Sequence, residues 1–310
     1  MSSVSNNLFQ ILYNDDFFEI LRKSTNWPFR IIKNQNYQLI EYDITLNLLT
    51  FCKLYLPVKI TVIGFPVSIC EKGYNGDLNI IIKDYKKRKG LFLFLNDDIL
   101  YLQESYRSGK TLPNCIFYNN FNSFEDYLSS LRSSYRRRLK LALNKGIELN
   151  IKKIENKNFS DEMYNLYLNV LQNSKYPLET LKKEFFQSFN SEIHVFYKEE
   201  KPIGFVQLKE INETLNFIFG GMDYKYRDQY DLYYNMLLFI LKTGINHKNK
   251  IINFGQTAEQ SKMKIGCKVQ TKYMHIYSGN KIIDYILTKL IKYLEYKETN
   301  KKLKVFKNGL

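Results

Sequence analysis

The order of secondary structure predicted for the second half of the chain restricts the possible folds more than any other feature. Hydrophobic periodicity predicts two helices, three successive strands, a helix, a strand, a short helix, a strand and a last helix. Their ranges are 161–173, 178–188, 192–199, 202–211, 214–221, 231–246, 250–254, 257–265, 267–277 and 281–295. The tight turn KEEKP joins the first two strands. We therefore expect three antiparallel strands and a helix that crosses to a parallel strand, which is an α/β (α+β) fold with mixed sheets flanked by helices.

The first half of the chain also mixes strands with helices. Strands are predicted at 37–47, 59–69, 91–95 and 114–118, and helices at 78–88, which Asp77 is placed to cap, and near 98–108. The length of 310 residues exceeds one average domain about twofold. We therefore expect an N-terminal domain over 1–122, a connecting helix over 123–146, a C-terminal domain over 147–280, and a basic C-terminal helix and tail over 281–310.

The connecting helix is strongly basic. Apolar residues recur every three or four positions from Ser123 to Lys145, and Gly146 is typical of a helix end. Its other face carries the arginines at 132, 136, 137 and 138 and a lysine at 140. This row is either a solvated linker surface or a phosphate-binding ridge.

The net charge of +15 is concentrated in two stretches. Residues 131–160 hold nine Lys or Arg against two Glu, and residues 281–310 hold eight Lys against three acidic residues. This pattern favours an anionic partner, such as RNA, a nucleotide-linked substrate or an anionic lipid surface. The alternative is compositional, because a chain encoded by AT-rich DNA accumulates lysine without selection for a ligand.

Several classes of protein are not indicated by the sequence. No apolar stretch approaches the length of a membrane-spanning helix, and acidic residues stand where a signal peptide would be apolar. The four cysteines lack C-x-x-C spacing, so we expect buried thiols in a reducing cytoplasm. There is no P-loop, G-x-S-x-G or H-E-x-x-H motif, and the three histidines lie far apart, so no metal site is expected.

Two segments resemble one family of transferases. The run FNSFEDYLSSLRSSYRRRLKLALNKGIEL (121–149) is similar to the helix that joins two GNAT-like domains in Fem-type peptidoglycan-bridge aminoacyltransferases and the related cellulose-biosynthesis-type acyltransferases. The run 222–277 resembles their ending, with Asp223 after a strand, Tyr233 and Tyr234 opening a helix, and a strand that ends in Asn-Phe-Gly. Lys262, followed by Ile265 and Gly266, matches the motif before the last strand.

This resemblance implies tandem GNAT-like domains, of which only the second keeps a reactive cleft. The family moves an acyl or aminoacyl group from a thioester or a charged tRNA to an amine without a metal. The acceptor would be a cell-envelope or nucleotide-sugar-type precursor in a bacterium. A backbone N–H on strand 215–221, which would splay from 251–254, would polarise the donor carbonyl.

The resemblance also assigns roles to residues. The implied catalytic residues are Asp223, Lys262 and Tyr233; the substrate-binding residues are Arg136, Arg137, Arg138, Asn253, Gln256 and Tyr234; and the donor-binding residues are Lys225 and Arg227. Each has a plainer interpretation. Asp223 could be a turn residue, Lys262 an exposed lysine on a short helix, and the tyrosines could pack in the core.

One departure concerns the donor. Acetyl-CoA-binding GNAT enzymes hold the pyrophosphate in a Q/R-x-x-G-x-G/A loop, whereas residues 224–231 of this chain contain no glycine. The donor is therefore expected to be an acyl-CoA held differently or an aminoacyl-tRNA. Two other functions remain open: a non-catalytic module that binds RNA or an anionic membrane surface, and an ordinary small-molecule acetyltransferase.

Overall fold

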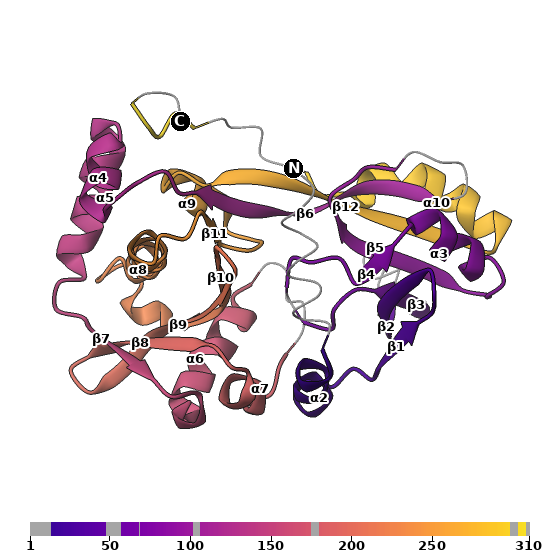
Figure 1. The fold of residues 1–310 in the computed structure, drawn as a ribbon, viewed down its shortest axis with the longest axis horizontal. Helices are drawn as coiled ribbons and strands as arrows, with labels where there is room; N and C mark the ends of the chain where they lie inside the picture. Colours follow the sequence, from indigo (N-terminus) through magenta and orange to yellow (C-terminus); the bar gives the residue numbers. More distant parts are fainter. Residues whose placement is uncertain are drawn as a thin grey trace. The chain divides into compact units, whose positions relative to one another are not determined.

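The protein is described here by a computed structural model, which covers residues 14–47, 57–67, 69–101, 106–174, 180–297 and 303–307. It is a mixed α/β structure in which a large mixed sheet is flanked by helices (Figure 1), and this confirms the expected fold class. The chain divides into two compact units. Unit 1 comprises residues 1–113 and 271–299, and unit 2 comprises residues 114–270 and 300–310.

Unit 1 is built on strands in the order β1-β2-β3-β5-β12, and β4 pairs with β2. Neighbouring strands are antiparallel except β3 and β5, which are parallel. The elements are α2 (Asp15–Ser24), β1 (Phe29–Lys33), β2 (Tyr37–Asn47), β3 (Pro57–Ile63), β4 (Tyr74–Gly76), α3 (Leu78–Tyr85), β5 (Leu91–Asp97), the first part of β6 (Arg107–Tyr118), most of β12 (Lys268–Ser278) and α10 (Lys281–Leu294).

One helix of unit 1 was predicted correctly and another was not. The Asp77 side chain accepts a hydrogen bond from the Asn79 amide and caps α3, as its sequence predicts. The helix predicted near 98–108 is wrong for the described residues, because 98–101 are irregular and β6 begins at Arg107; residues 102–105 lie outside the described ranges. Strand pairing at 107–118 outweighs a weak local helical pattern.

Unit 2 contains strands in the order β6-β11-β10-β9-β8-β7. Strands β8, β9 and β10 form an antiparallel meander, and β11 is parallel to β10, which confirms the order predicted for this half. The elements are α4 (Phe124–Ser130), α5 (Ser133–Lys145), β7 (Asn150–Ile154), η2 (Asn156–Asn158), α6 (Asp161–Gln172), α7 (Lys183–Ser188), β8 (Glu192–Lys198), β9 (Lys201–Ile211), β10 (Thr214–Met222), η3 (Tyr224–Tyr226), α8 (Leu232–Asn246), β11 (Ile251–Asn253) and α9 (Glu259–Lys264).

Two adjacent glycines of β10 allow helices to pack closely on both faces of this strand. A Cβ atom on Gly221 would lie 2.6 Å from the backbone nitrogen of Tyr167 in α6. A Cβ atom on Gly220 would lie 3.2 Å from the Met236 side chain of α8. Because successive side chains of a strand point to opposite faces, α6 and α8 cover opposite faces of β10.

The expectation of one long basic connecting helix is wrong. The segment forms two helices, α4 and α5, separated at Leu131, whose backbone is extended. Leu131 bridges to Phe306, and the Arg132 amide donates to the carbonyl of Val305 at 2.9 Å. Residues more than 170 positions away therefore interrupt a pattern that is locally helical throughout.

The two units repeat the same order of elements. In unit 1 three antiparallel strands (β1, β2, β3) lead through α3 to β5, which is parallel to β3. In unit 2 three antiparallel strands (β8, β9, β10) lead through α8 to β11, which is parallel to β10. In both units the strand that continues the sheet is distant in sequence. Strand β5 pairs with β12, which follows the other strands of unit 2 in the sequence, and β11 pairs with β6, which precedes them.

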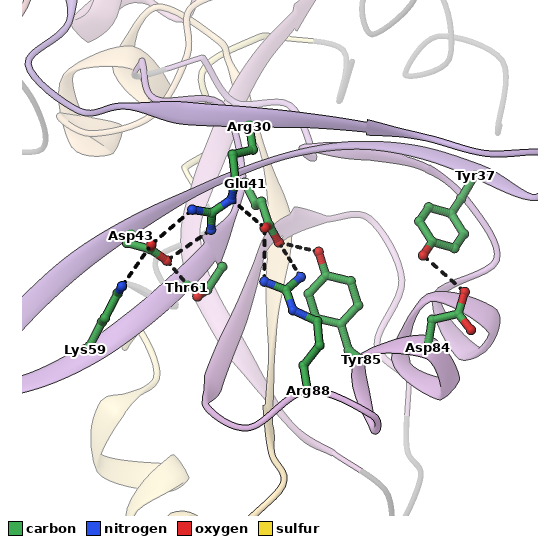
Figure 2. A network of polar contacts seen from close by, with 9 residues as sticks. All are labelled: Arg30, Tyr37, Glu41, Asp43, Lys59, Thr61, Asp84, Tyr85 and Arg88. Atoms are coloured by element: carbon green, nitrogen blue, oxygen red, sulfur yellow. Dashed lines mark hydrogen bonds and ion pairs between the residues drawn. The ribbon is translucent and has the colours of Figure 1, made fainter.

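A polar network lies on the sheet of unit 1 (Figure 2). The buried Glu41 carboxylate accepts hydrogen bonds from Arg30 at 2.9 Å, from Arg88 at 2.8 Å and from the Tyr85 hydroxyl. Burial disfavours ionisation of Asp43, but hydrogen bonds led by those from Thr61 and Arg30 outweigh it and lower its pKa to about 2. These basic side chains are therefore occupied by carboxylates of their own unit.

A second buried charge in unit 1 has no such set of strong partners. Glu71 is 7% exposed, and it lies near Lys272, whose ammonium pairs with Asp98 at 2.7 Å. Burial raises the pKa of Glu71 to about 7; the positive charge of Lys272 opposes this effect, and the negative charge of Asp98 adds to it.

Candidate functional site

The candidate site begins where β10 and β11 separate. The two strands pair only from Thr214 to Asn216 on β10, whereas β10 stays paired with β9 as far as Met222. The register of β10 against β9 shifts between Phe217 and Phe219, so Ile218 forms a β-bulge two residues after the last β10–β11 pair. In unit 1, by contrast, β3 and β5 remain paired to the last residue of β3. Among the residues that the structure describes, the parallel pair of unit 2 therefore separates within a strand, whereas that of unit 1 does not.

The opening between β10 and β11 beyond Asn216 and Asn253 is called the fork below. These two asparagines lie at its closed end, where the strands are still paired. The Asn253 Nδ2 group donates to Oδ1 of Asn216 at 3.2 Å, and Asn253 Oδ1 accepts from the amide of Gly255 at 3.0 Å. Asn216 is buried, and its own Nδ2 donates to the carbonyls of Lys209 and Thr214. The predicted site residue Asn253 thus shapes the start of the loop that follows β11.

This loop is held in an unusual backbone conformation. Gly255 has φ +70°, and the next turn contains Thr257 at φ +63° and Ala258 at φ +51°. A non-glycine residue in the left-handed region costs about 1–3 kcal/mol, and such residues concentrate at functional sites. The Gly255 carbonyl accepts from the Cys115 amide at 3.0 Å, which ties the loop to β6.

The side chain of Lys262 stabilises the loop that follows β11. Its side chain is buried, and Nζ donates to the Gln256 carbonyl at 2.6 Å and to the Gly255 carbonyl at 3.3 Å. The alternative of an exposed lysine on α9 is therefore wrong. Lys262 thus places a positive charge beside the loop that follows β11, where it fixes the carbonyl groups of Gly255 and Gln256.

Two thiols lie beside this lysine. Cys115 and Cys267 are buried and not in disulfides, as is Cys70, which agrees with the expectation of buried thiols; Cys52 lies outside the described residues. Burial raises the pKa of Cys115 to about 11 although the charge of Lys262 opposes the rise, and burial also raises the pKa of Cys267. Both thiols are therefore neutral at physiological pH and poor nucleophiles.

The two predicted tyrosines have different surroundings. Burial raises the pKa of Tyr233, with smaller contributions from Cys115 and Cys267, so its hydroxyl keeps its proton and can act as a donor. The ring of Tyr234 lies under the guanidinium of Arg138, 4.5 Å from its carbon atom. Tyr233 thus lies near the two thiols, and Tyr234 belongs to the contact between α5 and α8.

Asp223 lies at the other end of β10. Its carboxylate accepts from the Lys225 amide at 3.0 Å, caps the turn η3, and lies 3.8 Å from the ammonium of Lys201. Gly255 faces the carbonyl of Phe217, and six residues of strand, about 20 Å of extended chain, lead from there to Asp223. The structure therefore does not bring Asp223 and Lys262 to one reacting atom.

The three arginines of α5 do not form one ridge. Arg138 makes a bidentate ion pair with Asp231, at 2.7 and 3.0 Å, and lies over Tyr234. Arg136 donates to the carbonyl of Ser129 at 3.3 Å, and Arg137 is exposed. Arg138 thus links α5 to the start of α8, and Arg137 remains the most accessible of the three.

The predicted donor-binding residues lie on the turn after β10. Lys225 is exposed, and Arg227 is exposed and pairs with the adjacent Asp228 at 2.9 Å. The turn ends at Asp231, which has φ +46° and precedes α8. The turn offers charge at the surface but lacks the glycines of the usual pyrophosphate-binding loop.

Sequence reasoning missed Asn216 and the strained turn at 257–258. A signal for Asn216 was present, because an asparagine stands in the otherwise apolar run of β10, TLNFIF. Buried polar residues require partners, so this position pointed to a side-chain contact. Nothing in the sequence indicates left-handed φ values at a threonine and an alanine.

The fold resembles several solved structures, although no protein-family model and no curated protein sequence matches the chain. One is the C-terminal domain (DUF2156) of a putative lysylphosphatidylglycerol synthetase from Agrobacterium fabrum, with TM-score 0.57 and 10% identity over 95% of this chain and 96% of that one. L-PGS from Bacillus licheniformis gives TM-score 0.55 and 13% identity over 90% and 96%. FemX gives TM-score 0.50 and 9% identity over 91% and 94%. At these identities the matches establish the fold alone, and a fold shared with FemX agrees with the Fem-type resemblance of the two sequence segments.

Proposed function

From a fold shared with L-PGS and FemX, we propose that this chain is an acyl- or aminoacyltransferase. It would move an acyl group from a thioester or an aminoacyl-tRNA to an amine of a cell-envelope or nucleotide-sugar-type acceptor. The observation that carries the proposal is the fork between β10 and β11, which opens at a β-bulge beside a strained loop. Such an opening exposes backbone groups in the middle of a sheet, where they can polarise a carbonyl.

The repeated order of elements supports a tandem of two GNAT-like domains. Both units contain three antiparallel strands, a helix and a parallel strand, but only unit 2 is open between its parallel strands. We assign the reaction to unit 2 for this reason. Unit 1 would then serve substrate binding or the stability of the chain.

The residues of the fork suggest a division of tasks. The amine attacks the donor carbonyl, and the backbone of β10 at the bulge stabilises the developing oxyanion. The bond from the carbonyl carbon to the leaving sulfur or ribose oxygen then breaks, and the proton released by the amine passes through solvent to the leaving group. Tyr233 keeps its proton, so its hydroxyl would donate a hydrogen bond to the leaving group. Lys262 acts as a positioning residue, because its ammonium holds the loop carbonyls of Gly255 and Gln256. Asp223, at the far end of β10, would contact a part of the acceptor that is remote from the reacting amine.

The charged residues of the turn after β10 are the basis for the proposed donor. Lys225 and Arg227 are exposed there and can bind phosphates of CoA or tRNA as point charges, joined by Arg137. Without glycines, this turn favours a bulky polyanion over acetyl-CoA, so an aminoacyl-tRNA or longer acyl-CoA is the proposed donor. Both donors are cytoplasmic, and we therefore place the reaction there.

A binding module is the second candidate. It is favoured by two observations: the Asp223 carboxylate caps a turn, and Arg138 is engaged by Asp231. In this case the fork would be a remnant, and the exposed basic residues would capture RNA or an anionic membrane.

The first experiment is thermal stabilisation by acetyl-CoA, longer acyl-CoAs and bulk aminoacyl-tRNA. A ligand that binds only the folded chain stabilises it by about 2.7 kcal/mol at 100 times its Kd. A shift with charged but not uncharged tRNA would support aminoacyl transfer, and a shift with longer acyl-CoAs alone would support acyl transfer. A shift with acetyl-CoA would restore the small-molecule acetyltransferase. If no donor raises the melting temperature, the transferase proposal is refuted and the binding module becomes the favoured function.

A transfer assay with the identified donor then tests the fork. Lys262→Met should lower the rate about 100-fold, because small displacements of a positioning loop have effects of this size. Lys264→Met is the matched control, since Lys264 is exposed on the same helix. Tyr233→Phe removes only a hydroxyl and tests the site if the Lys262 variant folds poorly. Full activity in both variants would contradict the assignment.

A further inference from the structure

Helix α10 of unit 1 packs against its unit through one narrow face. Asp284, on this face, pairs with Arg107 at 2.7 Å, and Thr288 accepts from the same guanidinium at 2.6 Å. Leu287 is the buried residue of this face, and Ile291 approaches Gly109. These positions recur every three or four residues, so they form a single stripe.

The opposite face of α10 is apolar and exposed. Tyr293 is 80% exposed and Ile282 is 72% exposed. Including these two, the exposed large apolar residues of the helix are Ile282, Ile283, Tyr285, Ile286, Leu290, Tyr293 and Leu294. These seven are nearly half of the fifteen exposed large hydrophobic residues among the described residues, although α10 has only 14 residues. At about 100° per residue, Ile282, Ile286 and Tyr293 point directly away from the packed stripe.

The charges of α10 point to the nature of its partner. Among the described side chains of the helix, Lys289 and Lys292 are the exposed charged ones, and both lie on the side of the apolar face that carries Tyr285. The acidic residue Asp284 faces inward and is paired with Arg107. An exposed apolar face that contains tyrosines and has lysines along one side is the pattern of a helix that lies in the interface of an anionic membrane.

We infer that α10 docks this protein on an anionic lipid surface, with its apolar face in the headgroup region and its lysines on the lipid phosphates. A second copy of the chain fits this face less well. Two-fold pairing would bring the lysine flanks of two highly basic chains together, and like charges repel. The inference stands apart from the proposed transfer reaction, because docking requires no chemistry.

The test is co-sedimentation of the full chain with vesicles. One set is phosphatidylcholine alone, and the other is phosphatidylcholine mixed with an equal part of phosphatidylglycerol. The double variant Ile282→Asn/Tyr293→Ser removes two apolar anchors, and Lys289→Gln/Lys292→Gln removes the charged flank. Ile147→Ser is the matched control, because Ile147 is 81% exposed but belongs to unit 2. All altered side chains are exposed, so the melting temperature should not change.

We expect binding to the anionic vesicles, at least tenfold weaker to the neutral ones, and weakened by added salt. The apolar double variant should bind about tenfold less, and each lysine removed should weaken binding about fivefold. Ile147→Ser should bind like the parent chain. Equal binding of all variants, equal binding to both vesicles, or a dimer that forms through α10 without vesicle binding would each overturn the inference.

Discussion

The buried Glu71 carboxyl should make unit 1 less stable as the pH rises toward neutrality. Its pKa is about 7 in the folded chain, compared with an ordinary value of 4.5. Between these values the unfolded chain has released the proton and the folded chain has kept it. The folded state therefore binds more protons, and the free energy of unfolding falls with increasing pH until the folded carboxyl also ionises.

The size of the effect follows from the two pKa values. One pKa unit is worth about 1.4 kcal/mol, so the full loss is about 3 kcal/mol. From about pH 5 to pH 8 the loss should be about 2.5 kcal/mol, because part of it is already present at pH 5. Glu71→Gln keeps the shape of the side chain and has no proton to lose. The stability of this variant minus that of the parent should therefore rise by the same amount over this range.

Urea unfolding followed by fluorescence measures this difference. The single tryptophan, Trp27, lies in unit 1 and stacks on Tyr42, with ring centroids 5.4 Å apart, so its emission reports the unit that contains Glu71. Subtracting the parent curve removes other titrating groups, and Glu19→Gln provides an exposed carboxyl of the same unit as a control. A difference that is flat with pH, or that falls, would refute the reasoning.

Three further predictions concern unit 2. Gly255→Ala should lower stability by about 1–2 kcal/mol in urea unfolding, because the residue has φ +70° while the one atom near its Cβ is 3.8 Å away; an unchanged midpoint would contradict a strained loop. A double-mutant cycle of Arg138→Met and Asp231→Asn should give a coupling of about 1 kcal/mol, since the pair is bidentate but partly exposed, and zero coupling would mean that it does not join α5 to α8. Gly266→Ala would place a Cβ 2.4 Å from the ring of Phe306, so hydrogen exchange should accelerate at the amides between α4 and α5, and unchanged exchange would show that 303–307 does not hold this break.

Much of unit 2 could be predicted from local patterns. Helix α6 follows from apolar residues that recur on one buried face. Helix α8 and strand β9 are buried along most of their length and follow from their apolar runs between turn residues. Ser160 also caps α6 through its hydroxyl, in the way that its sequence position suggests. Such signals depend only on neighbouring residues, so these elements can be predicted without knowledge of the rest of the chain.

The features that sequence could not reveal depend on distant residues. The break between α4 and α5 arises from residues 303–307, which pair with it across the length of unit 2. The burial of Lys262 likewise requires a loop whose carbonyls receive its ammonium. The family motif drew attention to Lys262, but its spacing could not distinguish a group that faces substrate from one that supports a loop.

The late position of β12 in the sequence has a consequence for synthesis of the chain. While the ribosome is still translating unit 2, β5 lacks the neighbour that completes its side of the sheet, because β12 ends only at Ser278. Its hydrogen-bonding edge must therefore wait, exposed or shielded by a chaperone, for about 170 residues of further chain. A fragment that stops before β12 should aggregate through this edge, and the two units cannot be separated by a single cut without removing a strand from one of them.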